Sequence, residues 1–204
     1  MANQYARPSG LFGRLFIAPL LNRTNAGSNA AVFQSLELDP ESRVLEIGFG
    51  GGDLLFRIAS AVTDETTHGL ELSEDMIDRA RSKSKSRNLA GRISFQSGVV
   101  ISLPYDNCQF NRVCSVNTVY FWPDLTRAFT EIARVVEPGA LLVLGFGSHQ
   151  AMRDAGYDVD AFHLHPPDAI SQALLESGFS KERLETINRN KRGAFHISTS
   201  VLRS

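Results

Sequence analysis

The sequence predicts an α/β protein built on a doubly wound, mostly parallel sheet. Short segments typical of strands recur along the chain, at 43–47, 68–72, 92–97, 110–117 and 140–144. Stretches with the apolar spacing of amphipathic helices lie between most of them, at 53–59, 74–87 and 124–136. Strands that alternate with helices are typical of crossover connections, which place helices on the faces of a parallel sheet.

The most informative stretch is the end of the first predicted strand. Residues 43–47 form an apolar run that ends in glycines at positions 48, 50, 51 and 52, and a helical pattern follows from Asp53. A strand, a glycine turn and a helix together present backbone N–H groups and let a ligand approach the main chain closely. A dinucleotide fingerprint requires a third glycine where Asp53 stands. The motif is instead acid-x-Gly-x-Gly-x-Gly, beginning at Glu46, and a ligand-free turn is the alternative.

Glu71 is the second key position, because it ends the next predicted strand. In an open parallel sheet this places its carboxylate in the crevice beside the glycine turn. A carboxylate there can accept hydrogen bonds from both ribose hydroxyls of a nucleoside. The alternative is a charge that is favoured by the dipole of the following helix, where Ser73 is the expected N-cap. The spacing does not distinguish one nucleoside cofactor from another.

These features, together with two later segments, resemble the class I S-adenosylmethionine-dependent methyltransferases. Residues 98–105, Gly-Val-Val-Ile-Ser-Leu-Pro-Tyr, resemble the family stretch Gly-Asp-Ala-x-x-Leu-Pro-Phe, and an aromatic loop ending in Trp122-Pro123-Asp124 follows the fourth strand as in the family. The resemblance covers residues 40–145 and is closest to small-molecule enzymes akin to those of ubiquinone and menaquinone biosynthesis. It implies a Rossmann-like, seven-stranded sheet that closes with a hairpin, 181–188 and 194–202, whose last strand is antiparallel.

The resemblance implies S-adenosylmethionine as cofactor, S-adenosylhomocysteine as product, and in-line transfer of the methyl group to a small-molecule acceptor without a metal. Val99 stands where the family has an aspartate that commonly meets the adenine amino group, so backbone groups at Val99 and Val100 are expected to read the base. The expected cofactor-binding residues are Glu46, Gly48, Phe49, Gly50, Gly52, Glu71, Leu72, Met76, Val99, Val100 and Asn117.

The acceptor side is less defined by the sequence. Tyr120, Phe121 and Trp122 are expected to wall the acceptor pocket, unless they belong to the core. His149, just past the fifth strand, and Tyr120 are the candidate catalytic bases, and a hydrogen-bonded surface histidine is the alternative for His149. His163 and His165 are further candidates; they would make half a metal site, but no third ligand is evident, so no metal is predicted.

Composition and charge limit the partners. Hydrophobic residues make up 43% of the chain, charged residues 21%, and the net charge is −1, an ordinary balance that indicates no attraction to nucleic acid. The basic run 83–87 therefore predicts a solvated helix face. Cys108 and Cys114 suggest no disulfide framework. The apolar patch in residues 11–21 is too short to span a membrane, which favours a cytoplasmic protein without a stable membrane anchor.

The whole chain, 1–204, is expected to be a single methyltransferase domain with a cofactor-binding core at 40–145. Residues 1–30 are expected to form a lid or extension, with a polar loop at 22–29 before a helix at 30–36. Their apolar, phenylalanine-rich start suggests a lipophilic or aromatic acceptor. Two other functions compete: a non-catalytic nucleoside-binding or scaffold protein, which Val99 favours, and an NAD-dependent oxidoreductase, which Asp53 disfavours. The sequence gives no indication of oligomeric state.

Overall fold

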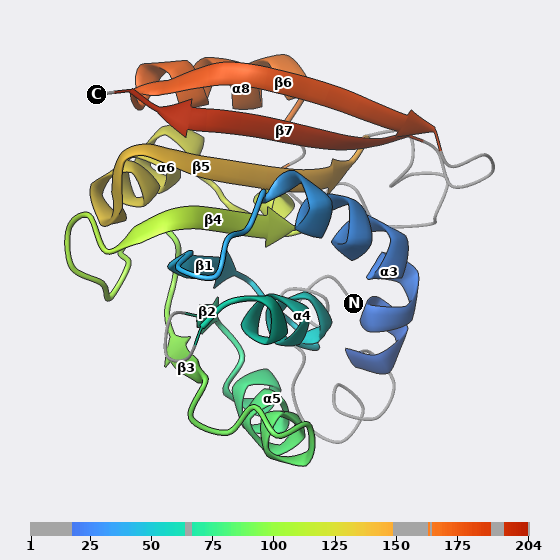
Figure 1. Cartoon of the computed structure of the whole chain (residues 1–204). Coiled ribbons are helices and arrows are strands. Elements are labelled where there is room, and N and C mark those ends of the chain that lie inside the picture. Colours follow the sequence, from blue (N-terminus) through green and yellow to red (C-terminus); the bar gives the residue numbers. More distant parts are fainter. Residues whose placement is uncertain (1–17, 64–66, 149–162, 164, 189–193, 204) are drawn as a thin grey trace.

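The computed structural model of the chain describes residues 18–63, 67–148, 163, 165–188 and 194–203. Its centre is a seven-stranded sheet with the order β3-β2-β1-β4-β5-β7-β6 (Figure 1). Among the strands described, β7 alone runs opposite in direction to the other strands, which confirms the predicted Rossmann-like sheet. The strands are β1 (Val44–Ile47), β2 (Thr67–Glu71), β3 (Ile93–Ser97), β4 (Phe110–Val116), β5 (Val136–Gly147), β6 (Phe179–Asn188) and β7 (Ala194–Leu202).

Helices cover both faces of this sheet, as a doubly wound topology requires. The apolar contacts place α3 (Ala18–Ser35), α4 (Asp53–Ala61) and α5 (Glu74–Ser86) on one face. The other face is covered by α6 (Leu125–Val135) and α8 (Pro167–Glu176). The strand order reverses between β1 and β4. Ligands of such sheets bind outside the carboxyl ends of the strands at this switch point, so the fold places a candidate site at the ends of β1 and β4.

The largest core cluster lies between the sheet and the helices α6 and α8. The apolar positions that predict helix α6 are the ones that the fold buries, and Ala128, Phe129 and Ile132 are all inaccessible to solvent. Asp124 caps this helix, because its side chain accepts a hydrogen bond from the Arg127 backbone N–H at 2.9 Å. A single amphipathic stripe therefore fixes which face of the sheet α6 covers.

Two predicted boundaries are wrong. Residues 22–29, predicted as a loop, belong to α3, which extends from Ala18 to Ser35. Small residues let this helix pack closely on the sheet, and Ser28 is fully buried. The sequence over 169–179 predicts a helix that ends at Gly178, but α8 ends at Glu176, because Gly178 adopts a φ of 90° and Phe179 already pairs with Leu202 in the sheet. Tertiary packing overrides the local preference in both places.

Strand β5 begins directly after α6, at Val136 rather than at the predicted residue 140. Val136 already pairs with Phe110 of β4, and the register shifts before the regular pairing of Arg112 with Leu141. Gly139 allows this irregular start because its φ is 83°. The carboxyl end of β5 reaches Gly147, beside the first residues of β7, where Gly147 pairs with Phe195. This junction forms the edge of the sheet next to the switch point.

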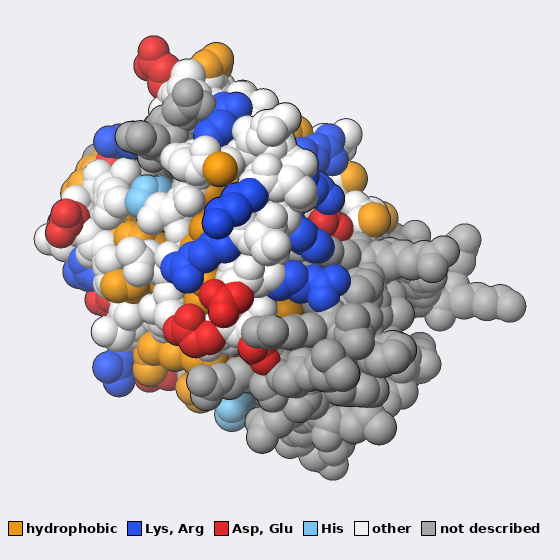
Figure 2. All heavy atoms as spheres, turned by 90° about the horizontal axis from the view of Figure 1, so that it is seen from below, with side chains coloured by type: hydrophobic (Ala, Val, Ile, Leu, Met, Phe, Trp, Pro, Cys, Tyr) orange, Lys and Arg blue, Asp and Glu red, His pale blue; other side chains and the backbone are white. Residues whose placement is uncertain are grey.

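The basic run 83–87 lies on α5 and the residue after it. Lys85 and Arg87 are exposed, as predicted for a solvated helix face. Figure 2 shows Lys and Arg side chains spread over this side of the molecule, with Asp and Glu side chains beside them. One such contact is the ion pair between Arg87 and Asp53, at 3.7 Å. Mixed charges of this kind give a hydrated surface rather than a field of a single sign.

Candidate active site

The glycine turn after β1 is built from three left-handed glycines. Gly48, Gly50 and Gly52 have φ values of 73°, 52° and 82°. A Cβ at Gly48 would collide with Thr118, and one at Gly52 would lie 2.8 Å from the Phe56 ring. A Cβ at Gly50 would have no atom within 4 Å among the described residues. The first and third glycines therefore allow tight packing, whereas Gly50 faces open space where a ligand can approach the main chain.

The side chain of Glu71, at the end of β2, is hydrogen-bonded to this turn. One carboxylate oxygen accepts a hydrogen bond from the Gly50 N–H at 3.0 Å, and the other accepts from the N–H groups of Leu72 at 2.8 Å and Ser73 at 3.0 Å. Burial raises the pKa of Glu71, and these three hydrogen bonds oppose that rise. A carboxylate offers about four acceptor positions. One position of the oxygen that faces Gly50 therefore stays open to a ligand hydroxyl.

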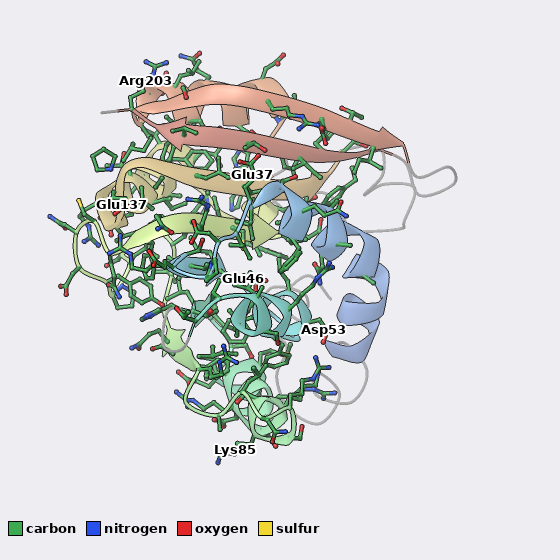
Figure 3. The ribbon with its side chains drawn as sticks, viewed as in Figure 1. Glu37, Glu46, Asp53, Lys85, Glu137 and Arg203 are labelled. Atoms are coloured by element: carbon green, nitrogen blue, oxygen red, sulfur yellow. The ribbon has the colours of Figure 1, made fainter. Side chains whose placement is uncertain are left out.

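Glu46 is the second buried acid of the site. It lies on β1, where Figure 3 labels it together with Asp53, and only 3% of it is exposed. Its Oε2 atom has no hydrogen-bond partner within the described part of the chain. Burial, and then the negative charges of Glu71 and Asp53, raise its pKa to about 8. Glu71 has three N–H donors that favour its charged form, whereas the burial of Glu46 favours its protonated form near neutral pH.

The end of β4 is fastened to the ends of β1 and β5. The Ser115 hydroxyl donates to the Ile47 carbonyl at 2.8 Å, across the switch point. Asn117 follows in a left-handed conformation with a φ of 56°, and its N–H donates to the Gly145 carbonyl at 2.8 Å. Asparagine tolerates this conformation better than most residues. The three strand ends therefore form one rigid rim.

Tyr120 extends this rim to the end of β5. Its hydroxyl lies 3.3 Å from the Asn117 side-chain oxygen and 3.2 Å from the Gly147 carbonyl, and it accepts the Gly147 N–H. The side chains of Tyr120 and Trp122 are buried in the main core, and Phe121 packs against that core. The Tyr120 hydroxyl thus links the carboxyl ends of β4 and β5. His149, the other candidate base, lies outside the described residues.

A cavity of about 260 Å³ opens beyond this link, where β5 ends and β7 begins. Phe146 and Gly147 line it from β5, His196 from β7, and His165 and Pro166 from the turn before α8. Tyr120, Phe121 and Trp122 are not among its lining residues. The sequence analysis did not identify His196 as a site residue. His196 reaches the cavity because it pairs with Phe146 across β5 and β7, and the sequence does not show this strand register.

The match to a known family lies on the same elements. A family model described as a methyltransferase domain matches residues 44–139, from the start of β1 to the start of β5. The match covers just under half of the chain, and it supports placing the chain among the class I S-adenosylmethionine-dependent methyltransferases. S-adenosylmethionine is the cofactor of this family, and S-adenosylhomocysteine is the product.

Relatives and solved structures agree with the family. The chain is 31% identical to 27-O-demethylrifamycin SV methyltransferase of Amycolatopsis mediterranei over 77% of this chain and 61% of the relative. Geranyl diphosphate C-methyltransferase of Streptomyces coelicolor, solved with S-adenosyl-L-homocysteine, superposes with a TM-score of 0.76 at 11% identity, over 97% of this chain and 86% of that chain. The [4+2]-cyclase SpnF gives the same TM-score at 19% identity, over 89% and 82%. The shared fold therefore does not by itself define the reaction.

The chain spans between 40% and 61% of the length of the first three curated relatives that it matches. No helix in the described residues combines the length and apolar character that crossing a membrane requires. The lid at residues 1–30 stays a prediction, since residues 1–17 lie outside the described part of the chain. A cytoplasmic location also stays a prediction.

The predicted donor-binding residues of this methyltransferase fall into two groups. Leu72 and Val99 are 40% and 43% exposed, and they are two of the three large hydrophobic side chains exposed in the described chain. Both follow neighbouring strand ends, joined by the hydrogen bond from the Gly98 N–H to the Glu71 carbonyl at 3.2 Å. Together with Gly50 and Glu71 they line the open edge of the sheet.

The second group is buried behind that edge. Phe49 is 5% exposed and packs edge-on against Phe95, with ring centroids 5.6 Å apart. Met76 and Val100 are 1% and 7% exposed. These three side chains pack behind the candidate site, and they offer a ligand their backbone more readily than their side chains. Substitutions there are expected to act through packing.

Proposed function

We propose that the protein transfers the methyl group of S-adenosylmethionine to a small-molecule acceptor by in-line displacement. The observation that carries the proposal is the meeting of an open glycine, Gly50, with the Glu71 carboxylate at adjacent strand ends. The names of the relatives point to small acceptors: 27-O-demethylrifamycin SV, fatty acids and demethylmenaquinone. A lipophilic or aromatic acceptor is in keeping with these names.

The residues present fit a nucleoside donor. Glu71 has one open acceptor position for a ribose hydroxyl, and a second becomes open if the donor displaces the Gly50 N–H. Leu72 and Val99 offer apolar surface to an adenine ring where the family aspartate is absent. Glu46, once ionised, is an anion near a donor that carries a cationic sulfur. The donor supplies an activated methyl group, so the protein has to align it with the acceptor at about 3 Å.

Calorimetry with S-adenosylmethionine, S-adenosylhomocysteine and NAD tests the donor site. We expect the first two to bind and NAD not to bind. Glu71→Gln should weaken binding of both by about 1–3 kcal/mol, because a hydrogen-bonded charge is lost. Glu74→Gln is the matched control, since this exposed glutamate three residues later has no place in the site. Equal losses in both variants, or binding of NAD alone, would contradict the proposal.

A second function is a donor-binding protein of this fold that does not transfer the methyl group. Val99 in place of the family acid, and the fold similarity to a [4+2]-cyclase, favour it. The two functions differ in turnover. A methyltransferase releases S-adenosylhomocysteine in proportion to the methylated acceptor, whereas the alternative binds the donor and leaves it intact. A donor with a chiral methyl group adds a test of the in-line geometry, because in-line transfer inverts the configuration at carbon.

A further inference from the structure

The cavity at the junction of β5 and β7 has a neutral, largely apolar lining. Phe146, Pro166 and the start of α8 contribute its apolar walls, and among the described residues that line it there is no Lys, Arg, Asp or Glu. Burial lowers the pKa of His196, which favours its neutral form. None of these described lining residues offers a phosphate or carboxylate group a cation to pair with. The cavity instead suits a compact, uncharged group, and its volume of about 260 Å³ approaches the lower end of ligand pockets.

His165 and the nearby His163 each form one hydrogen bond to the aromatic loop after β4. The His163 N–H donates to the Tyr120 carbonyl at 2.8 Å, which fixes the backbone of the segment. The Nε2 atom of His165 lies 2.8 Å from the Trp122 carbonyl oxygen. A carbonyl oxygen only accepts, so Nε2 carries the hydrogen in this contact. In the neutral imidazole the lone pair is then on Nδ1.

His196 faces the same cavity from β7. Its ring lies against Phe146, with centroids 5.3 Å apart, and its Nδ1 is 3.0 Å from the Thr186 hydroxyl. The ring is therefore oriented by a contact on the side of β6. Two imidazoles from different elements thus face a small apolar space. An aromatic ring with a single hydroxyl would meet flat apolar contacts and two imidazole rings in the lining of this space.

The cavity is joined to the donor side of the sheet through the rim. Tyr120 contacts both Asn117, at the end of β4, and Gly147, at the cavity wall. The glycine turn ends β1, two strands away from β5. Strands lie about 4.8 Å apart, so the cavity begins roughly 10 Å from that turn. An extended donor lying across the ends of β1 and β4 spans such a distance.

We infer that this cavity binds the hydroxyl-bearing aromatic ring of the acceptor, with the His165 Nδ1 accepting the hydroxyl proton. The inference rests on the proposed methyl transfer and names the acceptor as a phenol-type hydroxyl compound. As the O–H bond breaks, the proton goes to Nδ1, and the oxygen forms a bond to the methyl carbon. The methyl–sulfur bond breaks with its electron pair on sulfur. The products are a methyl ether, S-adenosylhomocysteine and an imidazolium, which returns its proton to solvent.

The tautomer of His165 provides the first test. In the full chain labelled with ¹⁵N-histidine, His165 should show a protonated Nε2 and an unprotonated Nδ1 at a pH where the ring is neutral. Its resonances are assigned by their loss in His165→Gln. A dominant Nδ1–H tautomer would overturn the inference, because no lone pair would then face the acceptor.

Ligand titration provides the second test, with 4-methylphenol as the probe and 4-methylanisole as its analogue without a hydroxyl. In the presence of S-adenosylhomocysteine, we expect 4-methylphenol to bind at least tenfold more tightly than 4-methylanisole. His165→Phe should abolish this difference, and Glu176→Gln, at an exposed residue at the end of α8, should leave it within twofold. If His165→Phe does not fold, His165→Leu replaces it. Equal binding of the two probes to the native chain would overturn the inference.

The titrations also separate this inference from the proposed function. If S-adenosylhomocysteine does not bind, the proposed donor site is wrong. The inference about the cavity is then tested by whether the chain without nucleoside binds 4-methylphenol more tightly than 4-methylanisole. If S-adenosylhomocysteine binds but 4-methylphenol does not, the donor site stands and the phenol-type acceptor is wrong. With both sites present, S-adenosylhomocysteine formation from 4-methylphenol should fall at least 100-fold in His165→Phe. It should stay within twofold of the native rate in Glu176→Gln.

Discussion

At the scale of single residues, the site depends on two buried glutamates that differ in their surroundings. Glu71 accepts three backbone hydrogen bonds, whereas Glu46 Oε2 accepts none from the described residues. Hydrogen bonds to the charged form favour ionisation, and burial without them favours the neutral acid. The pair therefore presents one negative charge and one proton close to the place proposed for a cationic donor.

The proton on Glu46 predicts a pH-dependent stability. The folded protein holds it up to a pKa of about 8, whereas the unfolded chain releases it near the ordinary value of 4.5. Between these values the folded state binds more protons, so the free energy of unfolding should fall as pH rises, by up to about 1.4 kcal/mol per pH unit. Urea unfolding at pH 5, 6, 7 and 8 measures this slope. Glu46→Gln should make it shallower, whereas the exposed control Glu41→Gln should not change it.

The glycine turn predicts different outcomes at its first and second glycines. Gly48→Ala should cost about 2–4 kcal/mol of stability, because the left-handed conformation and the collision with Thr118 add up. Gly50→Ala should cost only about 1–2 kcal/mol, from its conformation alone. Calorimetry should nevertheless show weaker S-adenosylmethionine binding in Gly50→Ala. Unchanged donor binding there would mean that the ligand does not approach this glycine.

At the scale of elements, helix α6 connects the aromatic loop to β5. Its N-cap, Asp124, comes two residues after Trp122, the residue whose carbonyl holds His165. The cap therefore fixes both the start of the helix and the end of the loop on which the acceptor cavity depends. The stability of this element and the geometry of the cavity are coupled through a few backbone groups.

Removing this cap gives the prediction at this scale. Asp124→Ala should lower the free energy of unfolding by about 0.5–2 kcal/mol, because the Arg127 N–H loses its acceptor. Asp168→Ala is the matched control, since Asp168 is an exposed acid in the first turn of α8, whose N-cap is Pro166. Chemical denaturation of both variants measures the difference. Equal losses would show that the helix dipole, rather than the cap, produces the effect.

At the scale of the whole molecule, helix α3 packs closely on the sheet where β5 meets β7. A Cβ at Gly145 would lie 2.7 Å from the Val32 side chain on α3 and 2.8 Å from the Phe195 ring on β7. The Gly145 carbonyl also accepts the Asn117 N–H at the rim of the site. One small residue therefore lets α3, β5 and β7 pack together behind the active edge.

This close packing predicts coupling between distant segments. Gly145→Ala should destabilise the protein by about 1–3 kcal/mol, because the core has no room for the added methyl group. In the double variant with Val32→Ala, the total loss should be smaller than the sum of the two single losses by about 0.5–1.5 kcal/mol. A cycle of urea unfolding measurements gives this coupling. Strict additivity would show that the added methyl group meets Phe195 alone.

The sequence by itself determined the features that are local. The acid-and-glycine motif, the strand ending at Glu71 and the stripe of α6 each depend on residues close together in the chain, whose spacing reflects the geometry of a turn, a strand or a helix. These features predicted the sheet, its antiparallel last strand and the family, all of which the structure and the relatives confirm.

Only the tertiary structure decided the features that depend on register and packing. It shows that Phe49 and Met76 are buried while Leu72 and Val99 are exposed, a distinction that apolar composition does not make. It also brings His165 to the Trp122 carbonyl and pairs His196 with Phe146, across separations that no local pattern encodes. The physical reason is that strand register and helix packing are set by the whole core, so the surroundings of a polar side chain exist only once the chain has folded.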